Sequence, residues 1–216
     1  MRRRGLIAAL LLLAGCASRD AGRVAVGPDA PLQGSDAPLQ GWRAVATEND
    51  RGRLRDWRRA WVEALRSAYA GGYNTDVARE GVLLFPDAAQ ANASLPDGTY
   101  DCRVIKVGAR EKGNLDYVAY PRFDCRVERR DGVQHLIKLT GSQRPVGQIY
   151  PDTGTRSVFL GTLMLGDERM AMRYGQDATR DVAGVVERIG VRRWRLVLPY
   201  PRFESLVDVV ELVPKT

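Results

Sequence analysis

The sequence predicts a mainly β (α+β) domain: an antiparallel β barrel or barrel-like sandwich of about eight strands, preceded by one amphipathic helix. Three observations support this fold class. From Thr99 onward apolar and polar residues alternate, which is the period of a half-buried strand. Turn signals separate the alternating segments, at Asp131-Gly132, Asp152-Thr153-Gly154, Gly166-Asp167 and Gly190. The connections are too short for the helices that a parallel sheet requires.

The helix is expected over Thr47 to Ala70. Thr47 or Asn49 supplies its N-terminal cap, and Gly71-Gly72 ends it. Its apolar residues recur every three or four positions and form one stripe, made of Leu54, Trp57, Trp61, Leu65 and Ala68. The stripe could contact a membrane or a partner. We interpret it as the face that packs on the domain's own sheet.

Two alternating segments carry Cys102 and Cys125. If Cys16 carries a lipid, these two cysteines remain, and in an oxidising compartment they are expected to form a disulfide; two buried free thiols are the alternative. An antiparallel register with Cys102 opposite Cys125 would also pair Tyr100 with Val127, Val104 with Phe123, Asp101 with Arg126 and Arg103 with Asp124. The same register puts a turn at Gly113-Asn114, within a frayed loop over about residues 108–117.

The other expected strands are His135 to Thr140, Val146 to Tyr150, Arg156 to Leu165, Ala183 to Ile189, Arg193 to Pro199 and Ser205 to Val213. In Arg193 to Pro199 the alternation predicts a buried Trp194 with the arginines outside, which argues against a basic-aromatic patch for nucleic acid. Met170 to Asp181 is either a short helix or a loop.

The chain begins with the three parts of a secretory signal peptide. Arg2, Arg3 and Arg4 precede the apolar run Leu6 to Leu13, which is too short to cross a bilayer, and Ala14-Gly15 lead to Cys16. We expect a signal peptide over 1–15, a lipidated N-terminus and flexible linker over 16–41, and the helix plus β domain over 42–216. The linker holds a tandem repeat, Asp29 to Gly34 and Asp36 to Gly41.

Leu13-Ala14-Gly15-Cys16 resembles the lipobox of bacterial lipoproteins. The resemblance implies cleavage before Cys16 and acylation of its sulfur and new N-terminus, which would hold the protein on a membrane. In the Gram-negative lipoproteins that this segment resembles, an aspartate after the cysteine favours the inner membrane. Ala17 follows Cys16 here, so the resemblance implies an outer-membrane lipoprotein that faces the periplasm.

The formal net charge of +7 does not predict a nucleic-acid partner. Loss of Arg2, Arg3 and Arg4 with the signal peptide would lower it to +4, and acidic residues are interspersed with the arginines almost everywhere. A nucleic-acid binder would gather its basic residues on one face.

Residues that carry chemistry are few. His135 is the only histidine, and a lone histidine cannot anchor a zinc site, so neither a metal nor a cofactor is expected. The best candidate for a binding loop is Ser142, Gln143 and Arg144, which offer a hydroxyl, an amide and a planar cation. An ordinary hairpin with solvated polar residues is the alternative. A nucleophilic Ser142 would need a base, and the extended strand places His135 far from it.

Four segments together are similar to an uncharacterised family of Gram-negative lipoproteins, a domain of unknown function, over about residues 51–213: Gly98-Thr99-Tyr100-Asp101-Cys102-Arg103, Gly141-Ser142-Gln143-Arg144, Val158-Phe159-Leu160-Gly161 and Arg193-Trp194-Arg195-Leu196-Val197. The chain also resembles, more weakly, the membrane-bound lysozyme inhibitors, which are small lipoproteins with a disulfide-bearing barrel and a Ser-Gly-type loop. Here the order is Gly141-Ser142, and the domain is longer.

These observations favour a non-catalytic binding or envelope-interaction module over an enzyme. The membrane would be reached through the lipid, and the partner would be an envelope protein or a small ligand. A lysozyme-inhibitor-like protein and a periplasmic hydrolase are the alternatives.

Overall fold

The structure is a computed structural model that describes residues 41–215, so Cys16, the expected signal peptide and nearly all of the expected linker lie outside the described residues. Its elements are α1 (Trp42–Val45), α2 (Glu48–Ala70), α3 (Asn74–Glu80), the short 3-10 helix η1 (Gly81–Leu83), β1 (Gly98–Ala109), β2 (Tyr117–Ala119), β3 (Phe123–Arg130), β4 (Val133–Lys138), β5 (Gln143–Thr153), β6 (Arg156–Leu165), β7 (Asp181–Gly190), β8 (Arg193–Pro199) and β9 (Ser205–Pro214).

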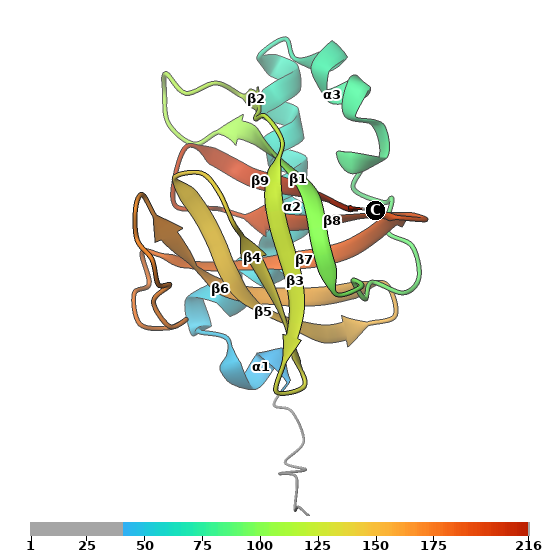
Figure 1. The fold of residues 1–216 in the computed structure, drawn as a ribbon. Coiled ribbons are helices and arrows are strands. Elements are labelled where there is room, and N and C mark those ends of the chain that lie inside the picture. The colour runs from blue at the N-terminus through green and yellow to red at the C-terminus, as the bar shows by residue number, and fades with distance from the viewer. Residues whose placement is uncertain (1–40, 216) are drawn as a thin grey trace, which may run out of the picture. The chain divides into compact units, whose positions relative to one another are not determined.

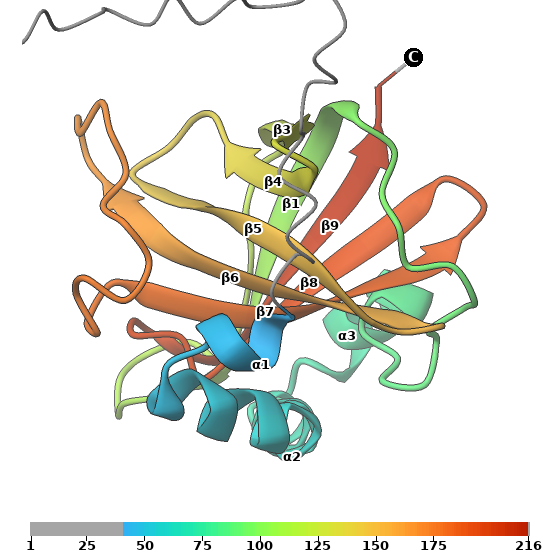
Figure 2. The same ribbon diagram turned by 90° about the horizontal axis from the view of Figure 1, so that it is seen from below.

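Eight strands close into an antiparallel barrel, and β2 is added beside the second half of β1 (Figures 1 and 2). Around the ring the order is β1, β3, β4, β5, β6, β7, β8 and β9, and β9 pairs back with β1. Closure leaves these eight strands with no unpaired sheet edge. The predicted fold class is therefore confirmed, and the barrel alternative is the one that the chain adopts.

A continuous apolar core fills the barrel, because alternate residues of each strand point inward. Trp194, Leu196 and Leu198 belong to this core, as their alternation predicts. Cys102 and Cys125 belong to it too and form the expected disulfide. Gly147 and Gly161 are partners in the β5–β6 register, and a Cβ on Gly161 would lie only 2.8 Å from the Cα of Gly147 on the neighbouring strand. The close approach of β5 and β6 therefore requires glycine.

Helix α2 lies across the outside of the barrel and covers β1, β7, β8 and β9 (Figure 2). The Thr47 side chain accepts a hydrogen bond from the Asp50 amide at 3.2 Å, so it is the N-terminal cap. The predicted stripe faces the sheet; Trp61 is 0% exposed, and burial of such a side chain contributes about 1.5–3 kcal/mol. Across residues 41–215 no helix is both long and apolar enough to cross a bilayer.

The predicted register of the two cysteine segments was wrong by two residues. Tyr100 pairs with Cys125, and Cys102 pairs with Phe123. Because side chains alternate with a period of two, this slip leaves the same residues facing inward, so the cysteines still meet diagonally, with their Cα atoms 6.1 Å apart. The predicted turn at Gly113-Asn114 does not join β1 to β3, because the chain first returns along β1 as β2.

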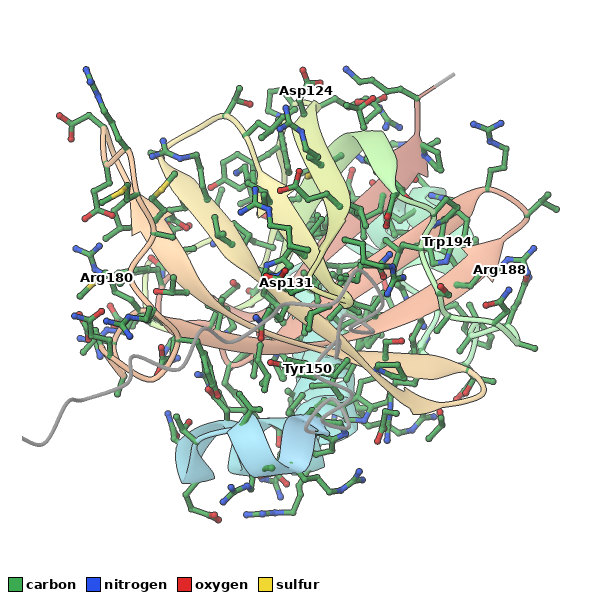
Figure 3. All side chains as sticks on the ribbon, turned by 60° about the horizontal axis from the view of Figure 1, so that its bottom comes forward. Asp124, Asp131, Tyr150, Arg180, Arg188 and Trp194 are labelled. Atoms are coloured by element: carbon green, nitrogen blue, oxygen red, sulfur yellow. A yellow bond between two sulfur atoms is a disulfide. The ribbon has the colours of Figure 1, made fainter. Side chains whose placement is uncertain are left out.

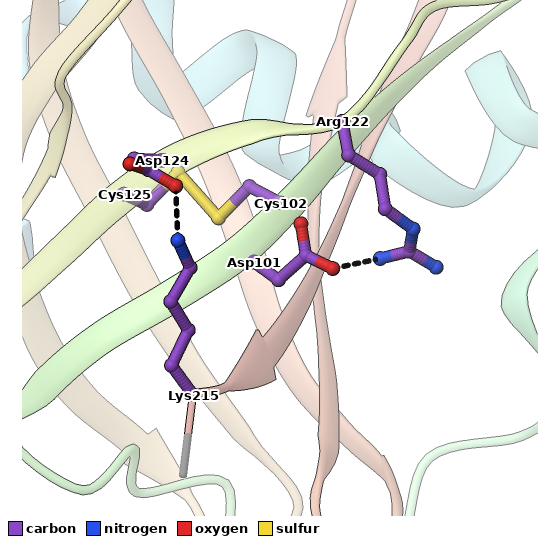
Figure 4. Close-up of a disulfide and its surroundings, with 6 residues drawn as sticks. All are labelled: Asp101, Cys102, Arg122, Asp124, Cys125 and Lys215. Atoms are coloured by element: carbon purple, nitrogen blue, oxygen red, sulfur yellow. Dashed lines mark hydrogen bonds and ion pairs between the residues drawn. A yellow bond between two sulfur atoms is a disulfide. The ribbon is translucent and has the colours of Figure 1, made fainter.

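The predicted charge pairs of that register were also wrong. Asp101 lies opposite Asp124, not opposite Arg126. Each of these carboxylates has its own cation from outside the pair (Figure 4): Arg122 donates to Asp101 at 3.0 Å, and Lys215 donates to Asp124. Like charges directly opposite on a sheet are destabilising, and these two cations offset that repulsion.

Arg195 points away from the barrel, as predicted for the arginines of β8, yet it is 0% exposed. Helix α2 and the segment 82–86 cover it. Its guanidinium lies 4.3 Å from the Trp61 ring centroid and donates to Glu187 at 2.7 Å. It also donates to the carbonyl groups of Val82, Leu83, Phe85 and Pro86. The alternation of a strand sets which way a side chain points, but not whether another element covers it.

We predict that Arg195→Met lowers the free energy of unfolding by about 3–5 kcal/mol, because it leaves the buried Glu187 carboxylate without its cation. Urea denaturation would measure this loss. Arg192→Met, at an exposed position, is the matched control and should change stability by less than about 0.5 kcal/mol. Equal effects of the two substitutions would contradict the role given to Arg195.

Candidate ligand-binding site at one end of the barrel

One end of the barrel opens into a cavity of about 340 Å³. In Figure 3 Arg180, which lines this cavity, and Trp194, which belongs to the core, lie on opposite sides of the barrel. Apolar side chains line the inner part of the cavity and form what we call the apolar floor: Val104, Phe123, Pro145, Leu163, Val182, Leu198 and Val210. The cavity therefore ends on the hydrophobic core and does not run through the barrel.

Polar and charged side chains surround the floor and form the polar rim of the cavity. Thr140, Ser142 and Gln143 contribute hydroxyl and amide groups. The lining contains four basic residues, Lys106, Lys138, Arg180 and Arg202, but only two acidic residues, Glu204 and Asp208. The rim thus carries an excess of positive charge above an apolar surface.

Lys106 is buried in the wall and neutralised by the protein itself. Its Nζ lies 3.1 Å from a carboxylate oxygen of Asp208 and 3.3 Å from one of Glu204, and the Ser205 hydroxyl donates to Asp208. Burial by itself would lower the pKa of Lys106, but the two carboxylates outweigh it, and the pKa lies above its ordinary value. Lys106 therefore remains a cation that is already paired.

Lys138 faces the same cavity without such a partner. Its Nζ lies 4.1 Å from the ring centroid of Phe123, and no carboxylate of the described residues lies within ion-pair distance. Burial lowers the pKa of Lys138, and the Lys106 cation lowers it further. A partly buried ammonium group beside an apolar surface is costly, and an anion placed next to it would offset this cost.

Lys138 was missed in the sequence, although a signal was present. It follows Gln134 and Leu136 at intervals of two in β4, and both of these are buried. The same parity points Lys138 into the barrel. A lysine on the inward face of a strand is unusual, and it could have been singled out on that ground.

The structure separates the residues of the candidate binding loop. Ser142 and Gln143 line the cavity, in which Lys138 also lies. Arg144 donates instead to the carbonyl groups of Gly141, Gly166 and Glu168, at 2.8, 2.6 and 2.7 Å. Its guanidinium therefore holds the start of β5 against the loop that follows β6.

His135 lies next to the inward-facing Leu136 and so points to the outer side of β4. No hydrogen bond within residues 41–215 joins it to the Ser142 side chain, so the nucleophile–base contact of a serine hydrolase is not formed there. In the same part of the chain no group of three or more His, Cys, Asp or Glu side chains could hold a metal ion.

The chain belongs to the family described as DUF4893, a domain of unknown function, whose model matches residues 42–212. This match confirms the coarser part of the expected resemblance, a family without an assigned activity. Neither the curated proteins nor the solved structures gave a match to this chain.

The two cavity lysines should respond differently to the same substitution. Lys106→Met leaves the buried Asp208 carboxylate without its ion-pair partner and should lower the free energy of unfolding by about 3 kcal/mol or more. Lys138→Met leaves no carboxylate without a partner and should change stability by less than about 1 kcal/mol. Chemical denaturation of both variants checks this, and a larger loss for Lys138→Met would contradict the assignment of the paired lysine.

Proposed function

We propose that this protein is a lipid-anchored, non-catalytic binding module of the cell envelope, whose barrel holds one small, partly apolar molecule. The observation that carries the proposal is the cavity itself, which ends on an apolar floor and has a few polar and charged groups around that floor. Ligand sites are typically concave and mostly apolar, with a few polar groups that orient the ligand. A barrel of about eight strands is wide enough to hold one small ligand.

The size of the cavity supports a ligand of this class. Its volume of about 340 Å³ lies at the lower end of the range for small-molecule sites, about 300–1,000 Å³. Seven apolar side chains form the floor, so most of the ligand's contact surface would be hydrocarbon. This matches a small ligand better than a metal ion or a nucleotide.

The proposed location is the outer membrane, facing the periplasm. It is supported by the run of Leu13-Ala14-Gly15-Cys16 behind three arginines, and by Ala17 after the cysteine. The Cys102–Cys125 disulfide of the barrel is in keeping with an oxidising compartment. The first helix of the described residues begins at Trp42, and the polar segment from Cys16 to Gly41 is the tether to the lipid in this proposal.

Binding can be tested with N-phenyl-1-naphthylamine, a neutral apolar probe that fluoresces in apolar surroundings. The protein should enhance its fluorescence saturably and with one site per chain. Leu163→Trp, which fills the floor, should abolish the enhancement, and Val191→Trp, at an exposed position between β7 and β8, should leave it unchanged. No saturable binding to the unmodified protein would refute the proposed binding function.

Lipid anchoring can be tested by growth with an alkyne-labelled fatty acid. The unmodified chain should incorporate the label, and Cys16→Ser should not. Cys102→Ser removes a different cysteine and is the control; it should be labelled like the unmodified chain. Equal labelling of Cys16→Ser and the unmodified chain would contradict the anchor.

A further inference from the structure

Two of the four basic residues that line the cavity are neutralised by carboxylates of the protein, and two are not. Lys106 is paired with Asp208 and Glu204, and Arg180 lies 2.5 Å from a carboxylate oxygen of Glu168. Within the described residues, Lys138 and Arg202 are the basic lining residues that form no ion pair, and Arg202 is exposed at the opening. Lys138 is therefore the uncompensated cation nearest to the floor.

The position of Lys138 marks the boundary between the two parts of the cavity. Its ammonium group lies over the ring of Phe123, which belongs to the floor. Ser142 and Gln143, on the next connection and strand, provide hydrogen-bond donors on the same wall. An anion beside Lys138 would thus have an ammonium group and polar donors around it, with the apolar floor directly beneath.

We infer that the ligand of this cavity is a small amphipathic acid, whose anionic head pairs with Lys138 and whose hydrocarbon tail lies on the apolar floor. The inference rests on the proposed binding function and names the ligand class for the same cavity. The anionic head balances the excess positive charge of the rim, and the hydrocarbon tail covers the apolar side chains of the floor. A carboxylate and a phosphate share this chemistry, and each can carry a hydrocarbon chain.

Three probes with the same eight-carbon alkyl tail test this inference: nonanoate, octyl phosphate and 1-octanol. Each is titrated into the full-length protein by isothermal titration calorimetry, below its micelle concentration or solubility limit. At least one of the two anions should bind about tenfold or more tightly than octanol, because a charge-assisted hydrogen bond contributes about 1.5–3 kcal/mol. The stronger of the two anions identifies the head group.

Two lysine variants separate the role of Lys138 from a general effect of positive charge. Lys138→Met should weaken binding of the preferred anion about tenfold and leave binding of octanol unchanged. Lys112→Met removes an exposed lysine outside the cavity and should change neither affinity. Unchanged octanol binding also shows that the Lys138→Met cavity is folded.

The inference is overturned if octanol binds as tightly as both anions, or if Lys138→Met keeps the full preference for the anion. In either case octanol binding would leave the proposed binding function standing. If none of the three probes binds, the inference is overturned as well, and the titration with N-phenyl-1-naphthylamine then decides separately whether the proposed binding function stands.

Discussion

The pairing of β1 with β9 is the contact on which the rest of the structure depends, because it joins the first barrel strand to the last and creates an inside. Its register runs from Tyr100 with Pro214 to Ala109 with Ser205. Two of its cross-strand pairs are oppositely charged: Lys106 with Asp208, on the inward face, and Arg103 with Glu211, on the outward face. Closure of the barrel therefore positions Lys106 and also brings Asp208 next to it, which neutralises its charge.

The sequence predicted well what a repeating pattern determines. The bounds of α2 agree with the prediction to within one residue, and the predicted strands Arg156 to Leu165 and Arg193 to Pro199 coincide with β6 and β8. The register of β1 and β3 was predicted wrongly, because a slip of two residues keeps every inward-facing side chain inward, so the hydrophobic pattern fits both registers equally well. Helix α3 has one buried apolar residue, Val77, which gives too little periodicity to detect.

The candidate site could be predicted only in part. The polar connection before β5 predicts Ser142 and Gln143 as binding residues, and the structure places them on the cavity wall. The geometry of Arg144 could not be foreseen, since its carbonyl partners include Gly166 and Glu168, more than twenty residues away. The cavity itself is formed by loops and strands that are distant in sequence, and no local pattern encodes which strand ends share one opening.

The disulfide has a consequence for the two lysines. Cys102 is the last residue of β1 that pairs with β3. The disulfide therefore lies at the end of this ladder, where separation of the two strands would begin. Across the next ladder Cys125 pairs with Lys138. The disulfide thus joins β1, which carries Lys106, to β3, which pairs with the strand β4 that carries Lys138. The scaffold therefore sets the spacing of the two ammonium groups, and the ligand that we propose would enter a cavity whose charges are already in place.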